Sequence, residues 1–381
     1  MRKRTQRETS WPVARLGPVA TPGHPGARQP DPNPRPLDHL TVFGARQAPA
    51  LVVNDEVLTY AALEEAVART AARLLSHGLR AGDRVATWMN KTRLACIAPV
   101  AAARAGLVHV PINPVLRRAQ AEHILDDSGA KLLIANRARL KSLGPTDVRV
   151  IALEDWSEGE DMLPLSGRDP GDLAALLYTS GSTGRPKGVM LSHANLWLGA
   201  VSVAHYLGLE PADRTLCVLP LAFDYGQNQL LATWAAGGSA VAFDYLLPKD
   251  VVRAVHRYEV TVLAGVPPLW LQLAEADWGG KAGESLRTLT NSGGHLPEPL
   301  VRRLRALFPA ARLHLMYGLT EAFRSSSLDP ALVDRHPDSV GRAIPFAELM
   351  VVRPDGTPVE PGEEGELVHA GPLVAQGYWN D

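Results

Sequence analysis

The alternation of short apolar runs with amphipathic segments is the feature that most constrains how this chain can fold. From about residue 58 onward an apolar run is followed by a turn, a segment with one apolar face, another turn and the next apolar run. In the first such segment Thr59 can cap a helix that ends near Gly78, and its apolar face consists of Leu63, Val67, Ala71 and Leu74. Strands separated by roughly 10–15 helical residues indicate βαβ units and mostly parallel sheets.

The same unit recurs over most of the chain. Predicted strands span residues 84–89, 107–110, 132–135, 173–177, 239–243, 261–266, 286–290 and 312–316. Further predicted helices span residues 117–127, 225–235, 249–258 and 298–307. After about Ser339 the pattern changes, because residues 348–352 and 366–369 have strand character around an Asp355-Gly356 turn. We therefore expect an α/β chain that ends in a small β-rich subdomain.

The first 36 residues differ from the rest of the chain. They hold seven basic and two acidic residues, eight prolines and no apolar periodicity. Such a segment cannot bury enough surface to offset its chain entropy, so we expect residues 1–36 to be disordered. An Arg-rich start is also typical of a transit peptide, although the amphipathic pattern is weak, and a start codon assigned too early is equally open. We favour a solvated tail without function.

Charge and cysteine content exclude several classes of protein. Lys and Arg number 39 and Asp and Glu number 40, a balance that argues against a nucleic-acid partner or an anionic membrane surface. Cys96 and Cys217 are too few for a disulfide framework and lack metal-ligand spacing. Apolar runs stay short of the roughly 18 residues that a membrane span requires, so no membrane insertion is expected. We predict a cytoplasmic enzyme.

A glycine-rich turn after the predicted strand 173–177 indicates a phosphate site. It reads Tyr178-Thr179-Ser180-Gly181-Ser182-Thr183-Gly184-Arg185-Pro186-Lys187-Gly188. Glycines let backbone N–H groups approach an anion, hydroxyls add donors, and Lys187 supplies a positive charge. It is not a Walker-type loop, because Pro186 precedes Lys187, Gly188 follows it, and a strand rather than a helix comes next. A surface turn of small polar residues is the alternative reading.

This loop matches, residue for residue, the phosphate-binding signature of the adenylate-forming superfamily, which includes acyl-CoA synthetases, peptide-synthetase adenylation domains and firefly luciferases. Residues 291–295 resemble the family segment that packs against adenine and floors the acyl pocket. Residues 317–321 resemble its adenine-stacking and magnesium motif. The resemblance runs from about Leu37 to Asp381 and is closest to the AMP-forming acyl-CoA ligases found with bacterial exosortase systems. The segments that carry this closer resemblance are residues 223–230, 244–248, 266–270, 290–294 and 317–325.

The resemblance implies a fold and a set of site residues. The fold would have two mostly parallel sheets with flanking helices, divided into AMP-binding subdomains at 37–338 and a β-rich subdomain at 339–381. Lys187, Thr320 and Glu321 would be catalytic, with Glu321 holding Mg²⁺. The residues implied to bind ATP are Thr179, Ser180, Gly181, Ser182, Thr183, Gly184, Lys187, Gly293, Gly294, His295, Tyr317, Gly318 and Thr320.

The acyl pocket is implied at Phe223, Asp224, Tyr225 and Gly293. In amino-acid-activating relatives a Phe-Asp pair at this place uses its Asp to hold the substrate ammonium, so Asp224 is compatible with an amine-bearing acid. A carboxylate at the N-terminus of the following helix is an equally open reading. We expect His193 to order the exit of the loop rather than to act as an acid or base.

The implied reaction is attack of a small carboxylic acid on ATP, with pyrophosphate release, and transfer of the acyl group to coenzyme A or to the phosphopantetheine arm of a carrier protein. Family members continue beyond the position of Asp381 with a ribose-binding Asp and a lid domain that carries a catalytic lysine. The sequence therefore predicts weak adenylation and little thioester formation by this chain alone. Amino-acid activation for a carrier protein and a non-catalytic nucleotide-binding remnant remain the alternatives.

Overall fold

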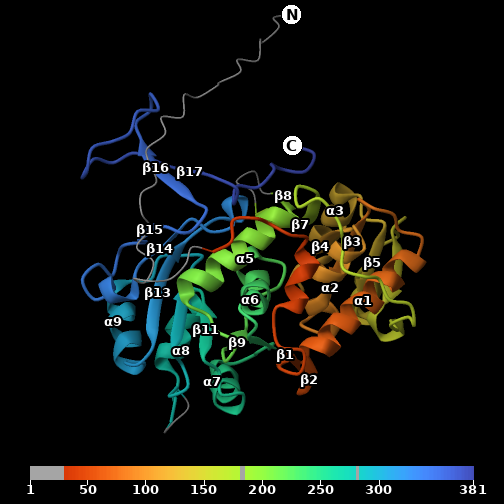
Figure 1. Cartoon of the computed structure of the whole chain (residues 1–381), viewed down its shortest axis with the longest axis horizontal. Coiled ribbons are helices and arrows are strands. Elements are labelled where there is room, and N and C mark those ends of the chain that lie inside the picture. Colours follow the sequence, from red (N-terminus) through yellow and green to blue (C-terminus); the bar gives the residue numbers. More distant parts are fainter. Residues whose placement is uncertain (1–29, 181–184, 280–282) are drawn as a thin grey trace, which may run out of the picture.

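The computed structural model of the chain describes residues 30–180, 185–279 and 283–381 (Figure 1). Two large β-sheets organise this part of the chain. The larger sheet has nine strands, in the order β15 (Arg342–Ala343), β14 (Ser326–Ser327), β13 (Arg312–Tyr317), β12 (Thr288–Asn291), β11 (Val262–Gly265), β9 (Arg214–Cys217), β10 (Ser239–Ala242), β1 (Pro49–Val53) and β2 (Glu56–Thr59). The other has six strands, in the order β6 (Arg149–Ala152), β5 (Leu132–Ala135), β3 (Arg84–Trp88), β4 (Val108–Pro111), β7 (Leu173–Ser180) and β8 (Pro186–Ser192).

Both sheets are parallel in their centres and antiparallel at their edges. In the larger sheet the pairs from β13 through β1 are parallel, whereas β2, β14 and β15 join antiparallel. In the six-stranded sheet the pairs from β6 through β7 are parallel and β8 is antiparallel. A separate antiparallel ribbon of β16 (Glu348–Val352) and β17 (Glu366–Ala370) lies near the C-terminal end. The prediction of two mostly parallel sheets and a small β-rich region is confirmed.

Four helices form a layer between the two sheets (Figure 1). They are α1 (Tyr60–Ser76), α2 (Arg93–Arg104), α5 (His193–Leu207) and α6 (Asp224–Ala235). Their buried side chains share one apolar cluster with residues of both sheets, such as Leu177 of β7 and Cys217 of β9. Because successive strand residues face opposite sides, Leu216 points instead to the outer cluster of the larger sheet.

The outer faces of the sheets carry the remaining long helices. Against the larger sheet pack α7 (Pro248–Arg257), α8 (Pro267–Glu275) and α9 (Glu298–Leu307), through a cluster that includes Val255, Trp270 and Leu304. Against the six-stranded sheet packs α3 (Arg118–Ser128), through Ala121, Ile124 and Leu125. Parallel sheets need cover on both faces, and the five layers provide it.

The predicted elements agree with the observed ones to within a few residues. The helix capped by Thr59 is α1, where the Thr59 side chain accepts from the Ala62 N–H, and α9 has the predicted bounds. The helix α5 and the hairpin of β1 and β2 were not predicted. Most side chains of α5 are buried, so it lacks the apolar and polar alternation on which the prediction rests. A short helix, α4 (Arg137–Ser142), follows β5.

Residues 30–36 lead into the first 3₁₀ helix, η1 (Leu37–Val42). Within the segment expected to be disordered, residues 1–29 lie outside the described residues. At its end Pro36 is buried, and the guanidinium of Arg35 lies 5.9 Å from the centre of the Trp197 ring on α5. This part of the predicted tail is therefore packed against the central helices.

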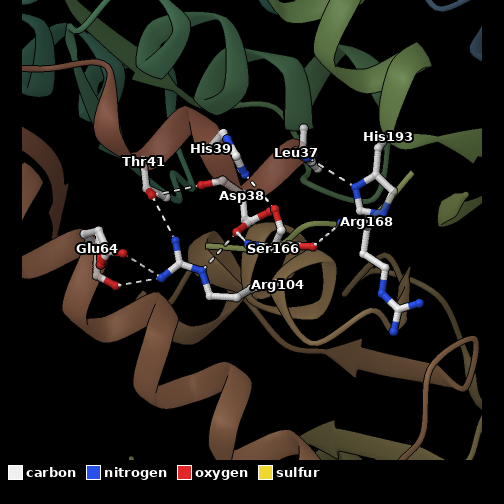
Figure 2. Close-up of polar contacts among 9 residues, drawn as sticks. All are labelled: Leu37, Asp38, His39, Thr41, Glu64, Arg104, Ser166, Arg168 and His193. Atoms are coloured by element: carbon white, nitrogen blue, oxygen red, sulfur yellow. Dashed lines mark hydrogen bonds and ion pairs between the residues drawn. The ribbon is translucent and has the colours of Figure 1, made fainter. Parts of the chain in front are cut away.

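A buried polar cluster anchors η1 to the rest of the molecule (Figure 2). Arg104 of α2 donates to Asp38 Oδ2 at 3.1 Å and to Glu64 Oε1 of α1 at 2.8 Å, and neither the Arg104 nor the Asp38 side chain is exposed. Asp38 Oδ2 also accepts from the Ser166 N–H at 3.0 Å. The cluster thus ties η1, α1, α2 and the segment before β7 together.

His193 closes the same region from α5. Its Nδ1 accepts a hydrogen bond from the Leu37 N–H at 3.2 Å (Figure 2). Burial lowers the pKa of this imidazole, and Arg168 lowers it further against the opposing effect of Asp38 and Asp172. A neutral ring with Nδ1 as acceptor fits this contact.

Among the helices that the structure describes, none has the length and apolar character needed to cross a bilayer.

Candidate active site

The predicted adenine and acyl-pocket residues lie near the carboxyl ends of the parallel strands of the larger sheet, whereas the glycine-rich turn and Lys187 belong to the six-stranded sheet. Tyr317 ends β13, and Asn291 ends the neighbouring β12, with Asn291 in register with Leu315. Asp224 is the first residue of α6, which packs on the inner face of the same sheet. In open α/β sheets ligands bind at this edge, because loops from several strands converge there.

The glycine-rich turn joins β7 to β8. Residues 181–184 lie outside the described residues, so the predicted roles of Gly181, Ser182, Thr183 and Gly184 have no structural counterpart here. The strands on either side are antiparallel, with Thr179 opposite Lys187 and Tyr178 opposite Gly188. The turn is therefore a hairpin between two strands, as the sequence predicted.

Little room is left for a side chain at Gly188. A Cβ there would lie 3.0 Å from the Tyr178 ring, whose hydroxyl donates to Asp127 Oδ2 at 2.5 Å. This hydrogen bond holds the Tyr178 ring in place from α3, so a larger residue at position 188 would require the ring to shift slightly.

Lys187 faces the last residues of the described chain. Its Nζ lies 2.5 Å from Asp381 Oδ2 and 5.1 Å from the centre of the Tyr378 ring. The segment reaches this place because it pairs with β8: Met190 donates to the Gly377 carbonyl at 2.9 Å, and Trp379 donates to the Gly188 carbonyl at 2.7 Å. An unexpected aromatic side chain thus lies beside the predicted phosphate-binding lysine.

Glu321 lies on the other side of Tyr378. The Tyr378 hydroxyl donates to Glu321 Oε1 at 2.9 Å, and this hydrogen bond raises the pKa of Tyr378. The Glu321 carbonyl accepts from the Ala375 N–H at 2.8 Å. The structure therefore brings Lys187 and Glu321, 134 positions apart in the chain, to one aromatic ring.

Thr320 and Asp224 are in direct contact. Thr320 is 8% exposed, and its hydroxyl donates to Asp224 Oδ1 at 3.1 Å. The other oxygen of Asp224 accepts from Nη1 of Arg324 in a buried ion pair. Asp224 lies at the N-terminus of α6, where the helix dipole favours a negative charge. Whether Asp224 binds a substrate ammonium or only stabilises the start of α6, its carboxylate already accepts hydrogen bonds from Thr320 and Arg324.

Arg324 is a site residue that the sequence reasoning did not single out. Its guanidinium carbon lies 4.5 Å from the centre of the Tyr225 ring, and Nη1 also donates to the Phe323 carbonyl at 2.8 Å. Burial lowers the pKa of Arg324, but the Asp224 carboxylate together with Tyr206 and Tyr225 outweighs it, and the net shift is upward. The group stays charged at every physiological pH.

The residue before Arg324 has an unusual backbone conformation. Phe323 has φ +53°, a region that side-chain-bearing residues rarely adopt, and its ring is fully buried. The ring passes so close to Gly199 of α5 that a Cβ there would lie 2.1 Å from it. Strained backbone is commonly found at functional sites, where packing holds it.

The segment after β12 forms the floor of this region. Asn291 Nδ2 donates to the Gly294 carbonyl at 3.0 Å, and Gly293 has φ +76°, which favours glycine. The Tyr225 hydroxyl and Thr290 Oγ1 form a hydrogen bond of 2.7 Å between α6 and β12. The His295 side chain is exposed, and the Phe223 side chain is 41% exposed. The predicted pocket residues Tyr225 and Asp224 are inside, whereas Phe223 lies at the surface.

A small cavity of about 30 Å³ lies beneath these residues, between the inner helices and the larger sheet. Polar residues of its lining include Arg324, Tyr225, Thr290 and Asn228. The remaining lining is mostly apolar and comes from α5 and the strands, including Val203, Leu207, Val262, Ala264 and Met316. The cavity is the candidate acyl pocket.

The described residues fit a metal that arrives with a nucleotide. They contain no group of three or more His, Cys, Asp or Glu side chains able to hold an ion. Mg²⁺ is commonly bound through one or two carboxylates together with substrate phosphates, and Glu321 offers one hard oxygen ligand at the predicted place. The donor set therefore suits a phosphate-bound Mg²⁺.

Solved structures share this architecture. VinN in complex with L-aspartate superposes with a TM-score of 0.80 at 27% identity, covering 91% of this chain and 91% of that one. The o-succinylbenzoate-CoA synthetase MenE from Bacillus subtilis, bound to its acyl-adenylate intermediate, gives a TM-score of 0.81 at 28% identity, covering 92% of this chain and 72% of that one. The fold is that of the adenylate-forming enzymes.

Sequence comparison identifies the family. The chain matches the AMP-binding enzyme family over residues 41–379 and belongs to it. Feruloyl-CoA synthase of an Amycolatopsis species is 35% identical over 353 residues, which are 90% of this chain and 71% of that protein. The L-proline–[L-prolyl-carrier protein] ligase of Pseudomonas fluorescens Pf-5 is 32% identical over 354 residues, 87% of this chain and 70% of that protein. The chain is therefore an AMP-forming ligase of the acyl-CoA synthetase kind, as predicted, while its closeness to the exosortase-associated subgroup stays a prediction.

Proposed function

We propose that this chain activates a small carboxylic acid with ATP and prepares it for transfer to a thiol. In this reaction a carboxylate oxygen forms a bond to the α-phosphorus, the bond to the β-phosphate oxygen breaks, and pyrophosphate leaves with the electron pair. The observation that carries the proposal is the meeting of Lys187 and Glu321 at Tyr378, beside the end of β13. A cation and a hard oxygen ligand at one place suit a polyphosphate with its metal ion.

We assign the nucleotide roles along the strand ends. The half-buried Tyr317 would stack on adenine, above the backbone of Gly293 and Gly294 at the end of the next strand. Thr320, between Tyr317 and the acid pocket, would donate to the α-phosphate after exchanging its Asp224 partner. Lys187 and the hydroxyls of the glycine-rich turn would bind the pyrophosphate end.

Glu321 would hold Mg²⁺, which supplies charge neutralisation for the phosphates when it is bound. The carboxylate is kept in place by the Tyr378 hydroxyl and by the Ala375 N–H bonded to its backbone carbonyl. Groups that orient a metal ligand commonly affect metal affinity strongly. Tyr378 would therefore be a positioning residue for the metal.

Two thiol acceptors are candidates, coenzyme A and the phosphopantetheine arm of a carrier protein. Coenzyme A is favoured because feruloyl-CoA synthase is the more similar of the two relatives named above. Amino-acid activation for a carrier protein is the second candidate, because the buried Asp224 is bonded to Arg324, which lines the cavity, and one relative is a prolyl-carrier ligase. The predicted subdomain boundary at residue 339 and the cytoplasmic location remain predictions. Beyond this boundary, β15 pairs with β14 of the larger sheet.

Calorimetric titration of Mg·ATP into the purified chain tests the proposal. We expect saturable binding that Tyr317→Ala weakens about tenfold or more and that Tyr317→Phe retains, because Phe keeps the ring that stacks. Exchange of labelled pyrophosphate into ATP, run with a panel of carboxylic acids, then tests activation itself. A folded chain that binds no Mg·ATP would favour the reading as a non-catalytic remnant.

A further inference from the structure

The Arg324 side chain has unused hydrogen-bond donors. It is 2% exposed, and its Nη1 donates hydrogen bonds to the Asp224 carboxylate and to the Phe323 carbonyl. Its Nε and Nη2 atoms are buried and have no partner among the described residues. Nε carries one N–H group and Nη2 carries two, so three donors of one guanidinium are unsatisfied.

Buried charged donors without acceptors are strongly unfavourable, and native proteins seldom keep them without a bound water or ligand. Nε and Nη2 form one edge of the planar guanidinium fork, the geometry that receives both oxygens of a carboxylate. Stacking on Tyr225 and the bond to Asp224 hold this plane in one orientation. The free edge is therefore pre-organised to receive a planar anion.

The cavity next to Arg324 has the size for such a group. Its volume of about 30 Å³ admits roughly two or three water-sized groups, which is the scale of a carboxylate and far below that of a long acyl chain. A second unpartnered polar atom, Asn228 Oδ1, belongs to another lining residue, and rotation of this amide presents its N–H₂ group instead. An apolar acyl tail would leave both groups unsatisfied.

The local charges leave Arg324 able to accept a second anion. Asp224 has a source of stabilisation other than Arg324 in the N-terminus of the twelve-residue helix α6, to which the Thr320 hydroxyl adds before nucleotide binds. The Asp224 carboxylate therefore does not depend on Arg324 alone for its stabilisation. Because Arg324 also lines the cavity, we place the second carboxylate there, on Nε and Nη2 rather than on Nη1.

We propose that Arg324 is a specificity-determining residue that binds a second carboxylate of the acid substrate, so that the chain acts on short dicarboxylic acids. The inference rests on the proposed function and names the substrate class of that site. The reacting carboxylate would lie at the nucleotide end, near Thr320 and Tyr317, and the second carboxylate would lie on Nε and Nη2 of Arg324. Arg324 would take no part in the chemical step.

Paired acids of equal carbon number test the inference by calorimetry on the chain saturated with Mg·ATP. The pairs are malonate with propionate, succinate with butyrate and glutarate with valerate, and succinamate and L-aspartate are added to separate charge and amine effects. In at least one pair we expect the dicarboxylate to bind roughly tenfold or more tightly than its partner, since a buried polar site discriminates strongly against a ligand that lacks the matching group. Equal binding in every pair, or succinamate binding as well as succinate, would overturn the inference.

Variants tie the discrimination to the guanidinium. Arg324→Gln is expected to remove the preference for the dicarboxylate, and Asp224→Asn/Arg324→Gln to do the same without leaving an unpaired buried charge. Arg302→Gln, on the exposed face of α9, is the matched control and should keep the preference. If the double variant binds Mg·ATP normally and still prefers the dicarboxylate, Arg324 holds only water and the inference fails. Loss of Mg·ATP binding by the unsubstituted chain would instead be a failure of the proposed function.

Discussion

The hydroxyl of Tyr378 donates a hydrogen bond to Oε1 of Glu321 at 2.9 Å, although the two residues are 57 positions apart in the chain. The same ring lies beside the ammonium group of Lys187. One aromatic side chain thus contacts both the proposed metal ligand and the proposed phosphate-binding lysine. Its hydroxyl donates to Glu321 and its ring face contacts Lys187, so the two contacts can be tested separately.

Replacement of Tyr378 by Phe removes the hydroxyl and keeps the ring. We expect Mg·ATP binding to weaken up to about tenfold, because the Glu321 carboxylate loses the donor that orients it. Binding of ATP in the presence of a chelator should change little, since the ring over Lys187 remains. Titrations with and without Mg²⁺ measure the two effects, and an equal loss in both would contradict a role through the metal.

The buried pair of Arg104 and Asp38 should contribute strongly to stability. Arg104→Met leaves the fully buried Asp38 carboxylate without its cation, so we expect a loss of about 3–5 kcal/mol in the free energy of unfolding. Arg104→Met/Asp38→Asn removes both charges and should lose less. Urea denaturation of the two variants makes the comparison, and equal losses would show that the charge pairing is unimportant.

Gly226, in the first turn of α6, has no room for a side chain. A Cβ there would lie 1.9 Å from the Pro220 carbonyl oxygen. Alanine is favoured over glycine in a helix by about 1 kcal/mol, but we expect this contact to outweigh the gain and to destabilise Gly226→Ala by about 1–3 kcal/mol. Gly159→Ala is the control, because its Cβ would meet nothing closer than 4.0 Å. A Gly226→Ala variant as stable as the unsubstituted chain in thermal unfolding would refute the close approach.

His314 should make the fold sensitive to acid. Burial lowers its pKa to about 3, with a further contribution from Arg312, and neither ring nitrogen has a partner among the described residues. The unfolded chain binds a proton near pH 6.5, whereas the folded chain does so only near pH 3. The stability contribution is therefore present above pH 6.5 and is lost as the pH falls toward 3, at about 1.4 kcal/mol per pH unit or less.

Replacement of His314 by Phe isolates this effect. The apolar ring keeps the contact with Tyr206 and removes the proton-binding group, so we expect similar or higher stability at pH 7 and a smaller loss between pH 6.5 and pH 5. Urea denaturation at several pH values measures the slope. A slope equal to that of the unsubstituted chain would show that His314 does not titrate in this way.

Most of the fold was predictable because its elements carry local signals. The helices α1, α7 and α9 have one apolar face, and the strands β5, β10 and β13 are short apolar runs between turns. These signals depend on neighbours within about a dozen residues. The helix α5 escaped prediction because it is buried on nearly all sides, a property that its own pattern does not distinguish from other apolar runs.

The candidate site was predictable in part. The types and spacing of the residues in 178–188 and 317–321 indicated a nucleotide site, and the structure places Tyr317 and Thr320 at the strand ends where such a site is expected. Arg324 and Tyr378 lie within the span that resembles the family, but the motifs assign neither residue a role. Nothing in a local pattern shows that a residue 100 positions away in the chain supplies its ion partner, as Arg324 does for Asp224.

The sequence by itself determined the α/β class, the order of most strands and helices, the family and the kind of chemistry, because these follow from periodicity and from short motifs. Only the tertiary structure decided which charges meet. It pairs Asp224 with Arg324, leaves Nε and Nη2 of that guanidinium without a partner among the described residues, and brings Lys187 and Glu321 to Tyr378. The physical reason is that electrostatic and hydrogen-bond partners are chosen by distance in space, and packing of the two sheets around four shared helices sets those distances.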